Sequence, residues 1–272
     1  MTGSPGALVL HGLTGSPHSV ADLAAVLGAD GFKVEVPLLP GHGTSPEELA
    51  GYGWADWQTA AEEAFGRLAG QCSGGRIVVA GLSMGGALAA GVALAHAEVA
   101  GLAVVNPLVD PPAADFRCVL EAFLAEGERF LPGVGGDLAD PDARETAYDR
   151  LPVAALLSMS CGLEVLRPRL IDVRCPVLIL TSRHDHVVPS ASSDVLAGAV
   201  SGPVERVWLE RSHHVATLDL DRHELERRVV DFARSAVTAC RPASELGDTS
   251  EGQEEAGDDD ARGGDDREDG GE

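Results

Sequence analysis

The sequence predicts an α/β protein with a mostly parallel sheet, helices on both faces of the sheet and a small helical cap. Short runs that are apolar throughout alternate along the chain with longer amphipathic stretches. Such runs are typical of strands buried on both faces, as in parallel sheets. One long interval lacks a strand pattern, which predicts an insertion above the sheet.

The expected elements alternate in β-α order. The apolar runs predict six strands, at residues 7–10, 32–39, 76–80, 101–105, 176–181 and 204–209. Apolar residues at helical spacing predict the main helices, at residues 18–31, 54–68, 84–96 and 225–236. Alternation of this kind leads to a single sheet whose strands run in the same direction.

The interval at about 107–169 is rich in proline and glycine and interrupts the alternation. We expect a cap there, with helices at 113–130, 142–150 and 153–166. A cap of this kind would supply an apolar wall to a site below it. Its candidate wall residues are Val119, Leu120, Phe123, Leu124, Leu156 and Leu157.

One folded domain followed by a disordered tail is expected. Residues 1–242 form the folded domain, and residues 243–272 form an acidic tail too polar to fold by burial. The tail holds 13 acidic and 2 basic side chains, about half of the chain's formal charge of −23. The acidic balance disfavours nucleic acid and anionic lipid surfaces as partners. A small neutral substrate suits it better, and oligomeric state is left open.

The cysteines and the apolar runs indicate the cellular compartment in which the protein is expected. The five cysteines are scattered and form no C-x-x-C pair, which disfavours a disulfide framework or a structural zinc site. No signal peptide is visible, and no apolar run approaches the roughly 20 residues of a membrane span. We therefore expect a cytoplasmic protein without stable membrane insertion.

The candidate nucleophile is Ser83. Residues 81–85 read Gly-Leu-Ser-Met-Gly, which matches G-x-S-x-G, and they lie between a predicted strand and a predicted helix. This turn needs small residues on both sides of the serine, because the backbone there is sharply bent. A glycine-rich phosphate-binding loop is the alternative. The spacing here matches neither G-x-G-x-x-G nor G-x-x-x-x-G-K-[ST], the two common sequence patterns of such loops.

A serine nucleophile needs a base and an orienting acid. Asp185 follows the strand at 176–181, and the pair His213 and His214 follows the strand at 204–209. Carboxyl ends of parallel strands meet at one edge of a sheet, so these groups should lie near Ser83. The residues alone leave His213 and His214 nearly equal as bases. Asp219 and Asp221 are rival acids that we expect instead to cap the last helix.

A metal cluster is the competing interpretation of the same histidines, since His184, Asp185, His186, His213 and His214 are potential ligands. A bare His-Asp-His loop is a weak signal, and a histidine near a serine turn is better used as a base. No metal is therefore expected.

Three further positions are candidates for substrate contact. The turn after the first strand and the start of the helix after Ser83 should supply the backbone N–H groups of Leu13 and Met84 to an oxyanion hole. Asn106, just after the fourth strand, is either a polar contact to the leaving group or a structural turn residue.

The chain resembles the bacterial monoacylglycerol lipases and small carboxylesterases, which have the α/β-hydrolase fold. The resemblance is carried by residues 11–17, 41–44, 81–86, 185–189 and 214–219, and in the cap by 136–141 and 147–152. It implies hydrolysis of carboxylic esters, most specifically monoacylglycerols, without a metal or cofactor. It also implies that the base is His214, because the family's histidine precedes Val-x-Thr-Leu-Asp.

One departure and two alternatives accompany this resemblance. Family members usually have an N-terminal hairpin before the strand that begins here at Ala7. A thioesterase or another hydrolase could use the same three residues, because the pocket decides the substrate. A binding protein with an idle site is the alternative from a different class.

Overall fold

A computed structural model of the chain describes residues 4–72 and 76–239. The tail predicted at 243–272, and the domain boundary before it, lie outside these residues. The main sheet is parallel throughout, with strand order β2-β1-β3-β4-β7-β8. Its strands are β1 (Gly6–Leu10), β2 (Lys33–Glu35), β3 (Ile77–Leu82), β4 (Val99–Val105), β7 (Val177–Ser182) and β8 (Val204–Leu209).

All six predicted strands are confirmed, and one of them is much shorter than expected. The second strand was expected over 32–39, but β2 ends at Glu35. It is an edge strand and pairs only with β1 in the described sheet. The following residues turn away from the sheet and deliver Leu39 to the core, where its side chain is fully buried.

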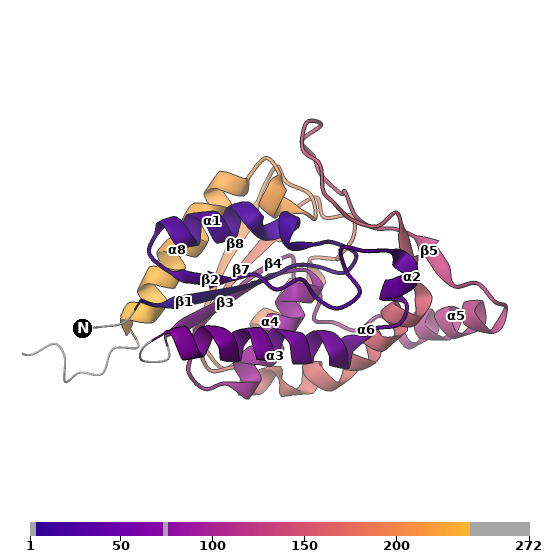
Figure 1. Cartoon of the computed structure of the whole chain (residues 1–272), viewed down its shortest axis with the longest axis horizontal. Helices are drawn as coiled ribbons and strands as arrows, with labels where there is room; N and C mark the ends of the chain where they lie inside the picture. The colour runs from indigo at the N-terminus through magenta and orange to yellow at the C-terminus, as the bar shows by residue number, and fades with distance from the viewer. Residues whose placement is uncertain (1–3, 73–75, 240–272) are drawn as a thin grey trace, which may run out of the picture. The chain divides into compact units, whose positions relative to one another are not determined.

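Helices cover both faces of the sheet, as predicted (Figure 1). One face packs against α1 (Ala21–Ala29) and α8 (Arg222–Ala239), and the other against α3 (Trp54–Gln71), α4 (Met84–Ala95) and α7 (Ala191–Ala199). Strand β1 shows why its run is apolar throughout: Leu8 and Leu10 join one core cluster, and Ala7 and Val9 join the other. Side chains alternate across a strand, so both faces must be apolar.

Short elements fill the connections. They are η1 (Pro17–Val20), α2 (Pro46–Leu49), η2 (Arg167–Asp172) and η3 (Ala216–Leu218). The helices α2 and α7 were not predicted. Helix α7 reads Ala-Ser-Ser-Asp-Val-Leu-Ala-Gly-Ala, which has a weak helical pattern. Burial of its Leu196 against the core stabilises it in place of intrinsic propensity.

The insertion between β4 and β7 contains α5 (Ala114–Ala125), β5 (Phe130–Pro132), β6 (Arg150–Pro152) and α6 (Val153–Leu166). The first and third predicted helices of the cap are confirmed by α5 and α6. The predicted helix at 142–150 is wrong. Leu151 of β6 pairs with Leu131 of β5 in an antiparallel ribbon, and the amide of Tyr148 donates to the carbonyl of Thr14, 3.0 Å away. These tertiary contacts hold the segment extended.

Among the described residues, no helix combines the length and the apolar character that crossing a membrane would require.

Candidate active site

The order of the strands decides where polar residues gather. Strand β1 lies between β2 and β3, so the chain runs from β1 toward the edge strand β2 and from β3 in the opposite direction, toward β4. Ligand sites in open parallel sheets lie at the carboxyl ends of the strands, beside such a reversal. The turns after β1 and β3 carry Leu13 and Ser83, and both residues line one cavity.

The turn at Ser83 has the geometry expected of a nucleophile on a sharp bend. Ser83 has φ +57° and ψ −120°, a conformation that L-residues rarely adopt. A Cβ at Gly81 would lie 2.2 Å from the carbonyl oxygen of Gly85, and one at Gly85 would lie 2.3 Å from that of Leu10. Both positions therefore require glycine, and the bend directs the Ser83 side chain toward the cavity.

Two backbone amides beside Ser83 remain the candidates for an oxyanion hole. Met84 is the first residue of α4, and the first amides of a helix have no acceptor within the helix. Leu13 lies in the turn after β1. Both residues line the cavity beside Ser83, so their amides can stabilise negative charge that develops on a substrate oxygen.

His214 and Asp185 meet in a nearly dry environment. His214 Nδ1 lies 2.8 Å from Asp185 Oδ2, and the side chains are 8% and 3% exposed. The second oxygen of the carboxylate, Oδ1, accepts from the amides of Val187 and Val188, each at 2.8 Å. The carboxylate is therefore held on both sides, and its free direction points at the imidazole. This leaves His214 Nε2 available to accept a proton.

Asp219 and Asp221 are not partners of His214. Asp219 accepts from the amides of Ala139 and His213, and Asp221 accepts from that of Ser212. Asp221 directly precedes α8, and its carbonyl accepts from the amide of Leu225, as expected of a residue that caps this helix. The carboxylates of Asp219 and Asp221 instead fasten the loop that precedes His214.

Asn106 does not line the cavity, which contradicts the expectation of a leaving-group contact. Its side chain is buried, and its φ of +45° is unusual. The amide Nδ2 donates to the carbonyl of His214 at 2.8 Å, and Oδ1 accepts from the amide of Ser182 at 2.7 Å. Asn106 therefore connects β7 to the histidine loop, which is the structural alternative expected for this position.

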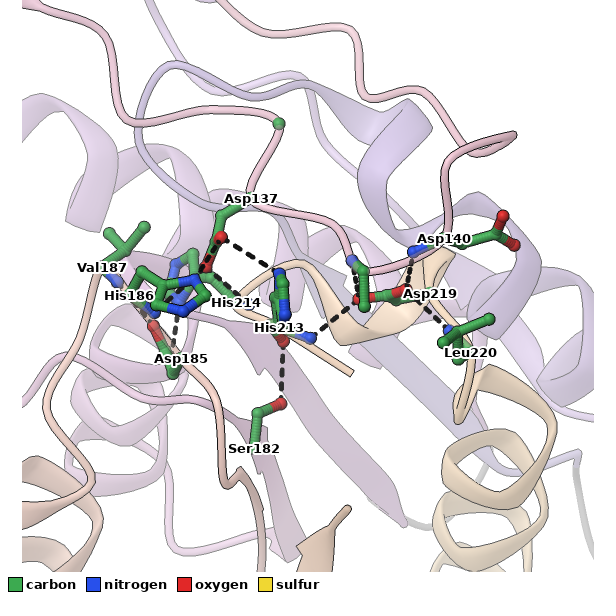
Figure 2. A network of polar contacts seen from close by, with 12 residues as sticks. Asp137, Asp140, Ser182, Asp185, His186, Val187, His213, His214, Asp219 and Leu220 are labelled. Atoms are coloured by element: carbon green, nitrogen blue, oxygen red, sulfur yellow. Dashed lines mark hydrogen bonds and ion pairs between the residues drawn. The ribbon is translucent and has the colours of Figure 1, made fainter. Parts of the chain in front are cut away.

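Asp137 lies in the cap segment 136–141 that carries the resemblance, but the sequence predicts no role for it. Its Oδ2 accepts from the amides of His186 and His214, each at 3.1 Å, and its carbonyl accepts from that of Val215 (Figure 2). Burial opposes ionisation, but the hydrogen bonds from His186 and His214 outweigh it and hold the pKa of Asp137 below its usual value. One carboxylate thus joins the cap to both loops that carry the candidate acid and base.

Two buried histidines support the turn after β1. His11 Nε2 accepts from the amide of Leu39 at 3.2 Å, and Nδ1 lies 3.0 Å from the carbonyl of Gly12. Burial, together with nearby His42, lowers the pKa of His11 to about 3. Burial also lowers the pKa of His42 to about 4. Both rings are therefore neutral at pH 7, and His11 braces the loop that carries Leu13.

The cavity measures about 570 Å³ and reaches from Ser83 and His214 into the cap. Its apolar wall includes Leu156, as predicted, but the other five predicted wall residues do not line it. Phe116, Leu131 and Met159 line it instead. The residues from α5, the β5-β6 ribbon and α6 therefore form the roof, and Ser83 and His214 lie at the floor.

Known proteins are similar to this chain in sequence and in fold. The family described as "Alpha/beta hydrolase family" matches residues 7–228. The chain is 38% identical over 233 residues to a thermostable monoacylglycerol lipase of Bacillus sp. (strain H-257), covering 85% of this chain and 90% of the relative. It is 24% identical to a carboxylesterase of Bacillus subtilis (strain 168), covering 85% and 92%.

Among solved structures, a metagenome-derived lipolytic enzyme superposes with a TM-score of 0.80 at 37% identity. The match covers 86% of this chain and 95% of that one. The monoacylglycerol lipase of Paleococcus ferrophilus has a TM-score of 0.68 at 19% identity, with 86% and 97% covered, and shares the fold.

Proposed function

Because this chain belongs to the alpha/beta hydrolase family, and its relatives at 38% and 24% identity are carboxylic ester hydrolases, we propose that it hydrolyses monoacylglycerols and similar acyl esters. The observation that carries the proposal is the joint placement of Ser83 and His214 at the floor of one apolar cavity. Asp185 behind His214 supports the same chemistry.

The reaction would follow two acyl-transfer steps. Ser83 Oγ attacks the ester carbonyl while His214 Nε2 takes its proton, and the oxyanion is stabilised by the amides of Leu13 and Met84. His214 then gives the proton to the leaving alcohol, and the acyl group remains on Ser83. Water repeats the sequence, with His214 as base, and releases the fatty acid. Asp185 fixes the imidazole tautomer and stabilises the imidazolium.

The cavity supports an acyl substrate. The cavity has a volume of about 570 Å³, and its apolar lining suits an acyl chain better than a charged ligand. This lining includes Phe116, Leu131, Leu156 and Met159. Burial of each methylene of an acyl chain contributes about 0.8 kcal/mol. Chain length should therefore strongly affect affinity until the cavity is filled.

Release of fatty acid from a medium-chain monoacylglycerol by the purified protein tests the proposal. Ser83→Ala should abolish release, because no other group in the proposed mechanism forms the acyl intermediate. Ser190→Ala is the matched control, since it removes an exposed hydroxyl that makes no helix-capping hydrogen bond to α7. A folded wild-type protein that releases no fatty acid would refute the monoacylglycerol assignment. Release of fatty acid that persists in Ser83→Ala would refute the assignment of Ser83 as the nucleophile.

A further inference from the structure

A second group of polar side chains lies next to the proposed catalytic triad of Ser83, His214 and Asp185. Asp137 of the cap, His186 after β7 and His213 after β8 converge in Figure 2. His186 Nδ1 lies 2.8 Å from Asp137 Oδ1, and His213 Nδ1 lies 3.4 Å from the same oxygen. One ligand-capable atom from each residue lies within 4.8 Å of the other two.

The backbone around these side chains holds them in place. The amides of His186 and His214 donate to Asp137 Oδ2, which fixes the carboxylate and leaves Oδ1 toward the two rings. The amide of His213 donates to Asp219 Oδ2 at 2.8 Å. The two hydrogen bonds to Oδ2 orient the Asp137 carboxylate, as outer-shell partners orient the ligands of a metal.

We propose that Asp137, His186 and His213 form a binding site for a divalent transition-metal ion of the Zn²⁺ class. Two imidazoles and one carboxylate are a ligand set that Zn²⁺ accepts, and three protein ligands leave a fourth position for water. Neither the proposed hydrolysis nor the fold requires this ion, so the site is separate from the acyl-transfer chemistry.

The distances suit such an ion after a small adjustment. Tetrahedral Zn²⁺ with bonds of the usual length holds neighbouring ligand atoms about 3.3 Å apart. Asp137 and His213 already meet this at 3.4 Å, and His186 must move away from Asp137 by roughly 0.5 Å. The ligand nitrogens of His186 and His213 lie within 4.8 Å of each other and need to approach by at most about 1.5 Å. The His186 side chain is 62% exposed, so its ring can make this adjustment largely on the solvent side.

The site is open to solvent and has a favourable charge. His213 is 26% exposed and Asp137 is 16% exposed, so a hydrated ion can reach all three ligands. The chain carries a formal charge of −23, which attracts cations to its surface. A bound ion would join the cap to the loops of Asp185 and His214 more firmly than the hydrogen bonds of Asp137 alone.

Equilibrium dialysis of the full chain against micromolar ZnCl₂, after treatment with a chelator, measures the binding. We expect His186→Gln and His213→Gln each to bind one equivalent fewer than the wild type. The affinity at this site should fall by more than the roughly tenfold to hundredfold that loss of an outer-shell partner costs. His223→Gln is the matched control: it removes another exposed histidine that contacts a carboxylate, Glu226 at 3.1 Å, and should retain the equivalent.

The variants keep the tail and the cysteines, so ions bound there cancel in the comparison. His186 is exposed, and its Gln variant should fold even if Asp137 variants do not. In differential scanning fluorimetry, Zn²⁺ should raise the Tm of the wild type and of His223→Gln but not of His186→Gln. Equal stoichiometry in the wild type and both ligand variants would overturn the proposal. The measurement contains no substrate, so its result is independent of the proposed hydrolysis.

Discussion

Replacing Asp185 with asparagine should impair hydrolysis because the amide is forced into the wrong orientation. Asp185 Oδ1 accepts from the amides of Val187 and Val188, each at 2.8 Å. In the variant only the carboxamide oxygen can satisfy these two donors. The NH₂ group must then face His214 Nδ1, which is 2.8 Å from the replaced oxygen.

A donor at that position inverts the tautomer of His214. The ring must accept at Nδ1, so its proton moves to Nε2, and Nε2 can no longer take the proton of Ser83. Restoring the active tautomer requires breaking one hydrogen bond and placing two donors against each other in a nearly dry site. These effects each contribute about 1–3 kcal/mol. Their sum of about 2–6 kcal/mol corresponds to a loss of about 30-fold to 10⁴-fold in kcat/KM.

The assay is the initial rate of hydrolysis of a medium-chain monoacylglycerol, with the Tm of each variant measured beside it. Asp149→Asn provides the matched control, since that side chain is 90% exposed and should leave the rate unchanged. An Asp185→Asn protein with wild-type Tm and a rate within tenfold of the wild type would refute the reasoning.

Other perturbations follow from buried contacts. Asn106→Ala should lower the free energy of unfolding by about 2–3 kcal/mol and reduce kcat, because the carbonyl of His214 loses its 2.8 Å donor. Gly85→Ala should destabilise the fold by about 3 kcal/mol or more, since its Cβ would lie 2.3 Å from Leu10 O. The pKa of His11 is about 3 in the folded protein, against 6.5 for a free histidine. The free energy of unfolding should therefore decrease as the pH falls below about 6.5, by about 2 kcal/mol at pH 5.

Urea unfolding measures the three changes in stability, and the initial rate of hydrolysis measures the kcat of Asn106→Ala. The sign for His11 follows from proton binding: between the two pKa values the unfolded chain is protonated and the folded protein is not, so acid favours unfolding. His11→Gln should remove about 2 kcal/mol of the acid-induced loss, whereas His18→Gln, at an exposed position, should not. A His11→Gln protein with an unchanged pH profile would contradict the account, as would wild-type stability in Asn106→Ala or Gly85→Ala.

The sheet could be predicted from the sequence because each strand carries its own local signal. Strands β3, β4 and β7 are buried on both faces and therefore apolar throughout, which sets them apart from any surface segment. The placement of Ser83 could be predicted for a related reason. Backbone oxygens would lie 2.2 and 2.3 Å from a Cβ at positions 81 and 85, so both must be glycine and the steric constraint is visible in the sequence itself.

The cap was predicted less well because tertiary contacts determine it. The ribbon of β5 and β6 joins segments about 20 residues apart, and each strand has three residues. No local pattern distinguishes such short strands from a loop or a short helix. The wall residues were misassigned for the same reason, since the orientation of α5 relative to the cavity depends on its packing against α6.

Asp137 and Asn106 show what spacing alone does not reveal about a site. Asp137 reaches loops some 49 and 77 residues away along the chain, at His186 and His214. Asn106 lies next to a strand end, where a ligand contact is a reasonable expectation. Its side-chain amide instead forms hydrogen bonds with Ser182 and His214. Whether a polar residue faces a cavity or supports a loop is decided by contacts between distant segments.

Labelling with an alkyl fluorophosphonate, which phosphonylates activated serines, tests the central claim most directly. We expect the intact mass of the folded protein to rise by one adduct, located by peptide mass spectrometry at Ser83, with loss of hydrolysis in proportion to labelling. His214→Ala should prevent the adduct, because Ser83 then has no base. An adduct on a different serine, or full hydrolysis by a protein completely labelled at Ser83, would contradict the assignment of Ser83 as the nucleophile.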